Sequence, residues 1–399
     1  MLTVGKKVAI DDGLLGLSVK RIEGTDVVCH VENTVMLGET KGINLPGTPV
    51  DLPSITEKDK QDLIFGVQQG VDLIAASFVR KADDVLEIRK VLGLPGRNIM
   101  IFSKIESEEG IENFDEILEV SDGIMVARGD LGIEIPIQDV YLAQKMIIRK
   151  CNIAGKPVIT ATQMLESMVV NPRPTRAEVT DVANAVCQGT DCVMLSGETA
   201  KGKWPVECVK MMGDIIRTTE MSLDYYNEFQ KMHAATVEAN ASSKGKNIVQ
   251  EAVSSSVVKT ALDINAAVLT VLSHTGATAR AVAKYKPHRP VICITPSDQT
   301  ARQLCLSRGV YPRTVGSMIG SDQILSHNVP PPLRTKWTRR VPHPVLIGHV
   351  SSLSQVSKLV EEGTIKEGDI VVCSHGDSHS SPGSTSVLKV IVAKPKGAA

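Results

Sequence analysis

Apolar side chains recur at every second position in the first part of this chain. Leu15, Leu17 and Val19 alternate with smaller or polar residues, and the pair Glu23-Gly24 is typical of a turn between strands. A period of two places alternate side chains on opposite faces of a β-strand. We therefore predict a small β-domain, part of a small β-barrel, over residues 1–50.

From residue 51 the pattern changes to short apolar runs that alternate with helix-like segments. The predicted helices cover 57–69, 83–92, 108–119, 137–154, 175–188 and 205–220, and the predicted strands cover 72–78, 98–104, 122–127, 157–162 and 191–196. Such alternation is typical of parallel βαβ units. The strands are fewer than the eight of a closed barrel. We therefore predict a partial (β/α)8 TIM barrel over 51–221.

A second block of alternating elements begins at about residue 222. Its predicted helices cover 248–261, 277–284 and 301–306, and its predicted strands cover 267–273, 291–295, 370–374 and 387–392. We assign 222–399 to a C-terminal α/β domain with a smaller open sheet. The fold class of the whole chain is therefore α/β.

One segment of the second block is rich in proline and basic residues. It contains Pro330-Pro-Pro332 and Arg339-Arg340, whereas the residues on either side, 321–326 and 356–363, read together as one amphipathic helix. Proline cannot continue a helix. We therefore predict an insertion at about 327–355 that interrupts this helix.

Composition narrows the classes of function. The chain has 399 residues and a net charge of -1, from 44 Lys and Arg against 45 Asp and Glu. This balance argues against binding to bulk nucleic acid or to a membrane surface, and no apolar run approaches the roughly 20 residues of a membrane span. The eight cysteines are scattered without a CxxC pair, which favours reduced thiols and a cytoplasmic location.

Charged residues follow two of the predicted strands directly. The apolar run 99–102 leads into Lys104 and Glu106, and the next predicted strand leads into Arg128 and Asp130. Parallel strands present their carboxyl ends at one edge of a sheet, where catalytic groups gather. Two carboxylates beside a cation suit a divalent metal together with a phosphate or carboxylate ligand.

Several long motifs, in a fixed order, resemble the pyruvate kinase family. They are Lys104-Ile-Glu106, Met125-Val-Ala-Arg-Gly-Asp-Leu-Gly132, Ala161-Thr-Gln-Met-Leu-Glu-Ser167, Asn171-Pro-Arg-Pro-Thr-Arg-Ala-Glu178, Asp181-Val-Ala-Asn-Ala185 and Met194-Leu-Ser-Gly-Glu-Thr-Ala200. The resemblance is dense from Val4 to about Gly320 and resumes near Val356. It implies phosphoryl transfer from phosphoenolpyruvate to ADP, giving pyruvate and ATP in glycolysis.

The resemblance implies roles for the residues at the strand ends. Glu106 and Asp130 would bind Mg²⁺ or Mn²⁺, Lys104 would neutralise charge on the transferring phosphoryl group, and Ser77 would line the phosphate site. From the residues alone, the two carboxylates also fit a surface salt-bridge pair, and Lys104 also fits a solvated lysine at the end of a strand.

Two further roles concern the substrate. The backbone N–H groups of Gly129 and Asp130, which we expect just before a short turn and helix, suit a substrate carboxylate, because helix N-termini bind anions. The resemblance places Thr162 where the enolate carbon is protonated, relaying a proton through water, with Ser196 and Glu198 as further members of that relay. From the residues alone, Thr162 is equally an ordinary β-branched strand residue.

The second block carries a candidate regulatory site. Its members are Ser273, Thr275, Gly276 and Thr278, which join a predicted strand to a helix and provide small hydroxyl groups beside a glycine. This pattern suits a phosphate, and the resemblance implies a sugar-phosphate activator, with Gly383-Ser-Thr385 in a closing loop. An ordinary N-cap turn fits the same residues equally well. The family resemblance also implies a homotetramer.

The resemblance begins partway through the small β-domain, so we expect an N-terminally shortened member of the family. In the family, the earlier segment supplies the first three barrel strands and the K⁺ ligands. Two alternatives therefore stay open: an inactive form that acts only through its regulatory domain and oligomer surfaces, and a different Mg²⁺-dependent enolate enzyme such as a lyase. Dependence of the reaction on ADP separates the kinase from the lyase.

Overall fold

A computed structural model describes residues 2–11, 13–48, 53, 55–242, 248–316, 365–366, 368–375 and 387–393. The chain divides into two compact units. The first comprises 1–151 and 157–222, and the second comprises 152–156 and 223–399. Among the described residues, no helix combines the length and the apolar character that crossing a membrane requires.

The first unit begins with a small antiparallel sheet. Its strands are β1 (Lys7–Ile10), β2 (Leu15–Glu23), β3 (Asp26–Val31) and β4 (Ile43–Asn44), in the order β3-β2-β1-β4. Val8 and Val19 are its most buried apolar side chains, at 7% and 1% exposure. The alternating pattern therefore forms the β-structure that the sequence predicts.

A parallel five-stranded sheet carries the rest of the first unit. Its strands are β5 (Leu73–Ala76), β6 (Met100–Ile105), β7 (Gly123–Ala127), β8 (Val158–Ala161) and β9 (Cys192–Met194), and they neighbour one another in chain order. Every neighbouring pair is parallel. The prediction of five parallel strands joined by helices is confirmed.

The helices of this sheet start and stop at residues that suit those positions. They are α1 (Glu57–Gln69), α2 (Ala82–Leu92), α3 (Glu108–Glu112), α4 (Phe114–Val120), α5 (Arg128–Glu134), α6 (Val140–Ala154), α7 (Arg176–Gln188), α8 (Gly197–Ala200) and α9 (Pro205–Met221), with 3₁₀ turns at Ile137–Asp139 and Glu166–Val169. Thr56 and Thr175 begin α1 and α7 with reciprocal capping boxes, and Gly70 and Gly189 end them in the left-handed conformation.

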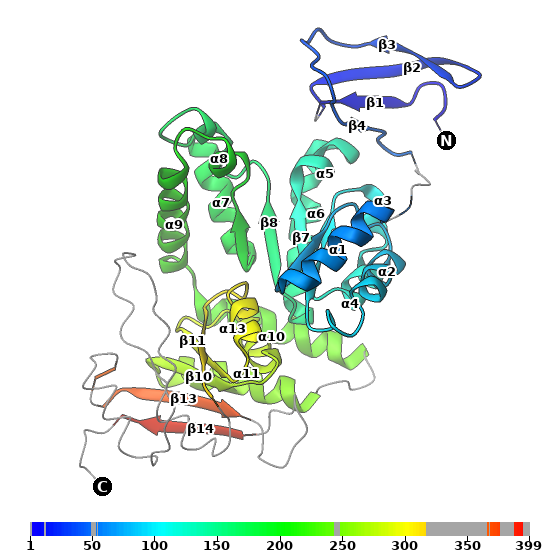
Figure 1. The fold of residues 1–399 in the computed structure, drawn as a ribbon. Coiled ribbons are helices and arrows are strands. Elements are labelled where there is room, and N and C mark those ends of the chain that lie inside the picture. Colours follow the sequence, from blue (N-terminus) through cyan, green and yellow to red (C-terminus); the bar gives the residue numbers. More distant parts are fainter. Residues whose placement is uncertain are drawn as a thin grey trace. The chain divides into compact units, whose positions relative to one another are not determined.

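The core of this unit lies between the sheet and its helices. On β6, Ile101 and Ile105 pack in one cluster with Ile88 of α2, Ile117 of α4 and Ile147 of α6. Figure 1 shows α6 next to strand β7. A second cluster joins α7 and α9 through side chains that include Val182, Ala185, Cys208 and Met212. The sheet therefore holds its strand ends on a buried, rigid base.

Two predictions about helices were wrong. The predicted helix 108–119 is broken into α3 and α4 at Asn113, whose side-chain amide donates to the carbonyl of Arg80 at 2.9 Å. We expected Asp130 to precede a helix, but α5 begins at Arg128 and contains Asp130. At both places a side chain contacts residues distant in the sequence: Asn113 contacts Arg80, and Arg128 contacts Ala161 and Asp181.

The second unit contains another five-stranded sheet. Its strands are β10 (Val268–Leu272), β11 (Val291–Thr295), β12 (Val310–Thr314), β13 (Ile370–His375) and β14 (Val387–Val392), in the order β12-β11-β10-β13-β14, with only β14 antiparallel to its neighbour. The helices are α10 (Tyr225–Ser242), which the sequence did not predict, α11 (Ile248–Asp263), α12 (Ala277–Ala283) and α13 (Asp298–Leu304).

Buried apolar clusters pack against this sheet, as is expected for a sheet that is covered on both faces. One cluster joins α10 and α11 to Leu269 and Val271, and another contains Val268 and Leu272 of the same strand. Figure 1 shows α10 and α11 beside β10. The predicted insertion at 327–355, its flanking helix and the loop Gly383-Ser-Thr385 lie outside the described residues.

The packing of β6 on β7 gives a test of the first sheet. Phe102 lies directly opposite Gly123 in the register, and a Cβ atom on Gly123 would overlap the buried Phe102 ring. We expect Gly123→Ala to lower the free energy of unfolding by about 1–3 kcal/mol in urea denaturation, because overpacking a dense core forces strain.

A helix glycine provides the matched control. Gly213 lies within α9, and a Cβ atom there would meet nothing closer than the Arg217 guanidinium at 3.7 Å. Gly213→Ala should therefore raise the free energy of unfolding by up to about 1 kcal/mol. Equal effects of the two substitutions would contradict the described register of β6 and β7.

Candidate active site

The parallel register brings the candidate residues to one edge of the β5–β9 sheet. Ile105 pairs with Val126 and Ala127 pairs with Ala161, so the carboxyl ends of β6, β7 and β8 neighbour one another. The first charged residues after those ends are Glu106 and Arg128. The arrangement follows from strand pairing and does not depend on the loops that follow.

Lys104, Ser77 and Glu106 form one contact group at the ends of β5 and β6. The Lys104 ammonium donates to the Ser77 hydroxyl at 2.8 Å and lies 2.7 Å from Oε1 of Glu106. The side chain of Lys104 is 24% exposed. The cation is therefore fixed between two neighbouring strand ends, with part of its surface open to a ligand.

Glu106 is almost fully buried, at 1% exposure, and its two oxygens differ. Oε2 accepts a hydrogen bond from the backbone N–H of Phe78 at 2.6 Å. Oε1 is buried and forms an ion pair with the Lys104 ammonium at 2.7 Å, with no further donor against it among the described residues. Phe78 itself has a left-handed backbone, with φ +55°, which turns its N–H group toward the carboxylate.

The buried Oε1 of Glu106, which is paired with Lys104 alone among the described residues, also suits a divalent cation. A buried carboxylate oxygen without a donor is costly unless a charge partner joins it. Within the described ranges, no group of three or more His, Cys, Asp or Glu side chains is placed to hold a metal. A site of one or two carboxylates leaves the other positions to substrate and water, which Mg²⁺ prefers.

Gly129 and Asp130 stand in the first turn of α5, where backbone N–H groups have no partner within the helix. Asp130 is half-buried. A Cβ atom on Gly129 would come within 2.8 Å of the Thr162 methyl group. The glycine therefore permits a close approach between the start of α5 and the end of β8.

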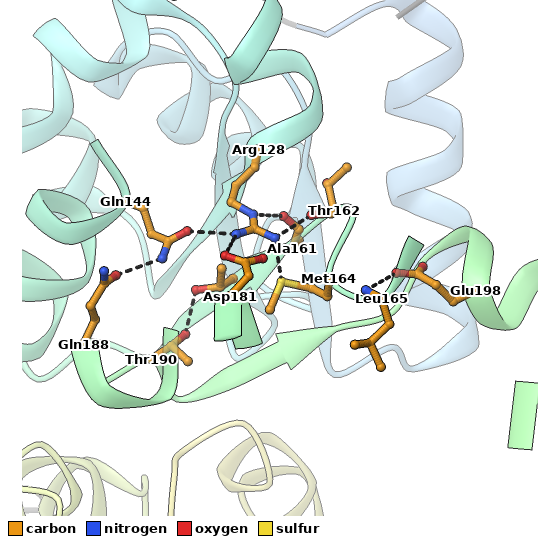
Figure 2. A network of polar contacts seen from close by, with 11 residues as sticks. Arg128, Gln144, Ala161, Thr162, Met164, Leu165, Asp181, Gln188, Thr190 and Glu198 are labelled. Atoms are coloured by element: carbon orange, nitrogen blue, oxygen red, sulfur yellow. Dashed lines mark hydrogen bonds and ion pairs between the residues drawn. The ribbon is translucent and has the colours of Figure 1, made fainter. Parts of the chain in front are cut away.

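Thr162 follows β8 in an unusual backbone conformation. Thr162 and Gln163 both have positive φ, at +76° and +56°, which is disfavoured for a β-branched residue. Figure 2 shows the guanidinium of Arg128 against this turn, where it donates to the Thr162 carbonyl at 2.8 Å. Thr162 is therefore no ordinary strand residue, because it lies just beyond β8 in a held turn.

Ser196 lies beside a buried carboxylate after β9. Glu198 is 0% exposed, and its two oxygens accept the N–H groups of Ser196 at 2.7 Å and of Leu165 at 3.1 Å. Figure 2 shows the contact between Leu165 and Glu198. Glu198 therefore ties the loop after β8 to the loop after β9.

The candidate regulatory residues lie in the second unit. Ser273 follows β10, and Gly276 caps α12 with φ +77°. The guanidinium of Arg280 folds back onto the carbonyl of Thr275 at 3.1 Å. Thr278 is 4% exposed and Ser273 is 6% exposed. These residues form one strand-to-helix turn, as their sequence order requires.

The structure thus joins some predicted site residues by direct contact. Ser77, Lys104 and Glu106 form one group, and Gly129 and Thr162 form another. From the sequence, Arg128 was identified only as a charge at a strand end, and Phe78 was not identified as a site residue. The signal for Arg128 was its position, since it follows the last apolar residue of a predicted strand. The conformation of Phe78 had no signal in the sequence.

A carboxylate near this site connects the small sheet to α5. Oε1 of Glu134 accepts from the side-chain amide of Asn44 on β4 at 3.4 Å. Burial raises the pKa of Glu134, the Asn44 hydrogen bond opposes this shift, and the charges of Asp130 and Glu108 raise the pKa further. The group therefore holds its proton more tightly in the folded chain than in the unfolded chain.

Two family models match this chain in sequence. "Pyruvate kinase, barrel domain" matches residues 1–209, and "Pyruvate kinase, alpha/beta domain" matches residues 251–391. The first match contains the β5–β9 sheet, and the second contains strands β10 to β13 and most of β14.

Curated relatives extend the similarity over most of the chain. "Pyruvate kinase" of Clostridium acetobutylicum is 46% identical over 97% of this chain and 75% of its own length. "Pyruvate kinase" of Dictyostelium discoideum is 52% identical over 81% of this chain and 63% of its own. "Pyruvate kinase PKLR" of Homo sapiens is 46% identical over 98% and 63%. The chain thus spans less than two thirds of the last two relatives.

The raised pKa of Glu134 makes a pH-dependent prediction. Because the folded chain binds this proton more tightly, stability falls as pH rises from the ordinary carboxyl range, about 4.3, through the raised value. Glu134→Gln keeps an acceptor for Asn44 and carries no charge. We expect it to raise the midpoint of thermal unfolding at pH 7 and to leave that midpoint unchanged near pH 4.

An exposed carboxylate on α3, Glu112, supplies the control. Glu112→Gln should shift the thermal midpoint little at either pH, because isolated surface changes have small effects. A Glu134→Gln variant that is less stable than the wild type at pH 7 would show that the charged form of Glu134 is the favoured one.

Proposed function

Because the chain belongs to the pyruvate kinase family, we propose that its strand-end site transfers a phosphoryl group from phosphoenolpyruvate to ADP, giving pyruvate and ATP. The observation that carries this proposal is the buried Glu106 carboxylate, whose Oε1 forms an ion pair with the Lys104 ammonium at 2.7 Å. A fixed cation beside a buried carboxylate oxygen suits a reaction that moves negative charge between oxygens.

Glu106 and Asp130 are the residues that we propose for Mg²⁺ or Mn²⁺. They follow neighbouring strands, and the buried oxygen of Glu106 is the stronger candidate ligand because the Lys104 ammonium is its one partner among the described residues. When bound, the metal supplies positive charge that neutralises phosphate and enolate oxygens. K⁺ is the second cation that we propose, as in the family, and we assign no ligands to it here.

Lys104 neutralises negative charge on the phosphoryl group while that group is transferred. Its ammonium is held at 2.8 Å by Ser77 and faces Glu106, so it needs no reorganisation when negative charge develops. Ser77 lines the same position. The N–H groups of Gly129 and Asp130, in the first turn of α5, hold the substrate carboxylate.

Thr162 takes part in the second half of the reaction. Loss of the phosphoryl group leaves an enolate, which must gain a proton at its terminal carbon to become pyruvate. The Thr162 side chain adjoins Gly129, beside the proposed carboxylate position, and we propose that its hydroxyl orders the water that delivers this proton. Ser196 belongs to the same relay, with its backbone fixed by Glu198.

The second unit has a regulatory role in this proposal. Ser273, Thr275, Gly276 and Thr278 bind the phosphate of a sugar-phosphate activator, and the chain assembles as a homotetramer. We further propose a cytoplasmic location and a place in glycolysis. One observation supports the location: all eight cysteines are free thiols, as is usual in a reducing compartment.

Substitution of Lys104 tests the proposed reaction. We expect Lys104→Met to lower kcat for pyruvate formation from phosphoenolpyruvate and ADP by about 10³-fold, because it removes a preorganised charge from the transition state. Lys58→Met is the matched control, since Lys58 is an exposed lysine of α1 paired with Asp62. It should leave kcat unchanged.

Omission of single components separates the alternatives. The kinase requires both phosphoenolpyruvate and ADP, whereas a lyase would not need ADP. A folded wild-type chain that forms no pyruvate with Mg²⁺ and K⁺ present would contradict the proposed activity. That result would favour a chain that acts only through its second unit and its oligomer surfaces.

A further inference from the structure

The turn after β8 is held by one side chain that the proposed reaction does not yet use. The Arg128 guanidinium donates from Nε to the carbonyl of Ala161 at 3.2 Å and from Nη2 to the carbonyl of Thr162 at 2.8 Å. Nη2 also lies 2.8 Å from the sulfur of Met164. One planar group thus contacts three residues in a stretch of four, across the point where φ becomes positive.

Arg128 is itself fixed in place. Its side chain is 13% exposed, and Nη1 lies 2.7 Å from Oδ1 of Asp181 on α7. Nη1 also reaches Oε1 of Gln144 on α6 at 3.3 Å, and Gln144 in turn donates to Gln188 at 2.8 Å. Figure 2 shows these partners converging on the guanidinium from separate segments of the chain. The charge of Arg128 is therefore paired, and its orientation is set from two helices.

The planar shape of the guanidinium group allows Arg128 to make these contacts at the same time. Arginine offers five N–H donors in one rigid fork, whereas lysine offers a single ammonium on a flexible stem. Contacts to two successive carbonyls and a carboxylate at once require the fork. The network therefore depends on the shape of the side chain as well as on its charge.

Arg128 also connects the two halves of the candidate site. It directly precedes Gly129, whose N–H group belongs to the proposed carboxylate position. Through Thr162 it controls the side chain that lies against that same glycine, since an ideal Cβ on Gly129 would lie 2.8 Å from the Thr162 methyl and 3.8 Å from the Thr162 hydroxyl oxygen. The same arginine therefore sets the separation between substrate carboxylate and proton donor.

We propose that Arg128 is a positioning residue for protonation of the enolate, acting by holding Thr162 in its left-handed conformation. The inference rests on the proposed function. In this step the π electron pair of the enolate forms the new C–H bond at the terminal carbon, with a proton from water on Thr162. The C–O bond becomes the pyruvate carbonyl, and solvent returns a proton to the relay.

The test uses the full chain and two reactions. Pyruvate formation with phosphoenolpyruvate and ADP reports the whole cycle. Loss of the pyruvate methyl proton signal in D₂O, with Mg²⁺, K⁺ and inorganic phosphate, reports proton transfer at that carbon alone. Amide hydrogen exchange of peptides that cover 161–168 reports the turn itself and requires no activity.

For Arg128→Met we expect kcat and the methyl exchange rate to fall together by about 100-fold, because a displacement of about 1 Å has an effect of that size. KM for phosphoenolpyruvate should stay within about threefold. Arg128→Lys should recover only part of the loss. Amide exchange should rise in 161–168 and stay unchanged in the strands.

Arg89→Met is the matched control. Arg89 is a half-buried arginine at the opposite end of the same sheet, where it pairs with Asp122 at 2.7 Å and donates to the carbonyl of Ile99 at 3.2 Å. Like Arg128→Met, the substitution Arg89→Met removes an ion pair and a hydrogen bond to a backbone carbonyl, but these contacts do not involve the turn at 161–164. Methyl exchange and amide exchange in 161–168 should both match the wild type.

Two results would overturn the inference. Wild-type rates of methyl exchange in Arg128→Met would show that the turn needs no arginine. A loss of methyl exchange of equal size in Arg89→Met would show that the effect comes from a general loss of stability. A folded wild-type chain that performs neither reaction contradicts the proposed function instead. In that case, unchanged amide exchange of residues 161–168 in Arg128→Met would contradict the inference that Arg128 holds the turn.

Discussion

The parallel register of strands β5 to β9 is the constraint on which the candidate site depends. Because these strands pair in chain order, their carboxyl ends meet at one edge, and the first residues beyond β6, β7 and β8 become neighbours. A buried cluster that includes Ile101, Ile124 and Ile147 packs these strands against their helices. The backbone around the candidate site therefore departs from regular structure only locally, at residues beyond the strand ends.

Those departures occur at the strand ends. Phe78 and Thr162 take left-handed backbones at the ends of β5 and β8, and each is held by a charged side chain from a neighbouring strand end. In one case the carboxylate of Glu106 accepts an N–H group, and in the other the guanidinium of Arg128 donates to a carbonyl. Strained residues persist only where the surroundings fix them, so each charge has a structural role at its strand end.

Much of the fold could be predicted from the sequence, because it depends on local periodicity. The bounds of α1 and β11 match the prediction, since a capping threonine and an unbroken apolar run mark them. The break at Asn113 and the start of α5 at Arg128 could not be predicted, because tertiary contacts decide them. The strand-end position of Lys104 and Glu106 was predicted, whereas the contacts of Arg128 with Ala161 and Asp181 span more than 30 positions in sequence and leave no local signal.

We propose that Glu106 and Asp130 hold one divalent cation at the edge of the sheet. The most direct measurement is a crystal structure of the chain with Mn²⁺ and phosphoenolpyruvate, in which anomalous scattering locates the metal. We expect an anomalous peak within coordination distance of Oε1 of Glu106 and of the Asp130 carboxylate, with Lys104 beside the phosphate. A metal bound elsewhere, with Oε1 of Glu106 still without a ligand, would contradict the account.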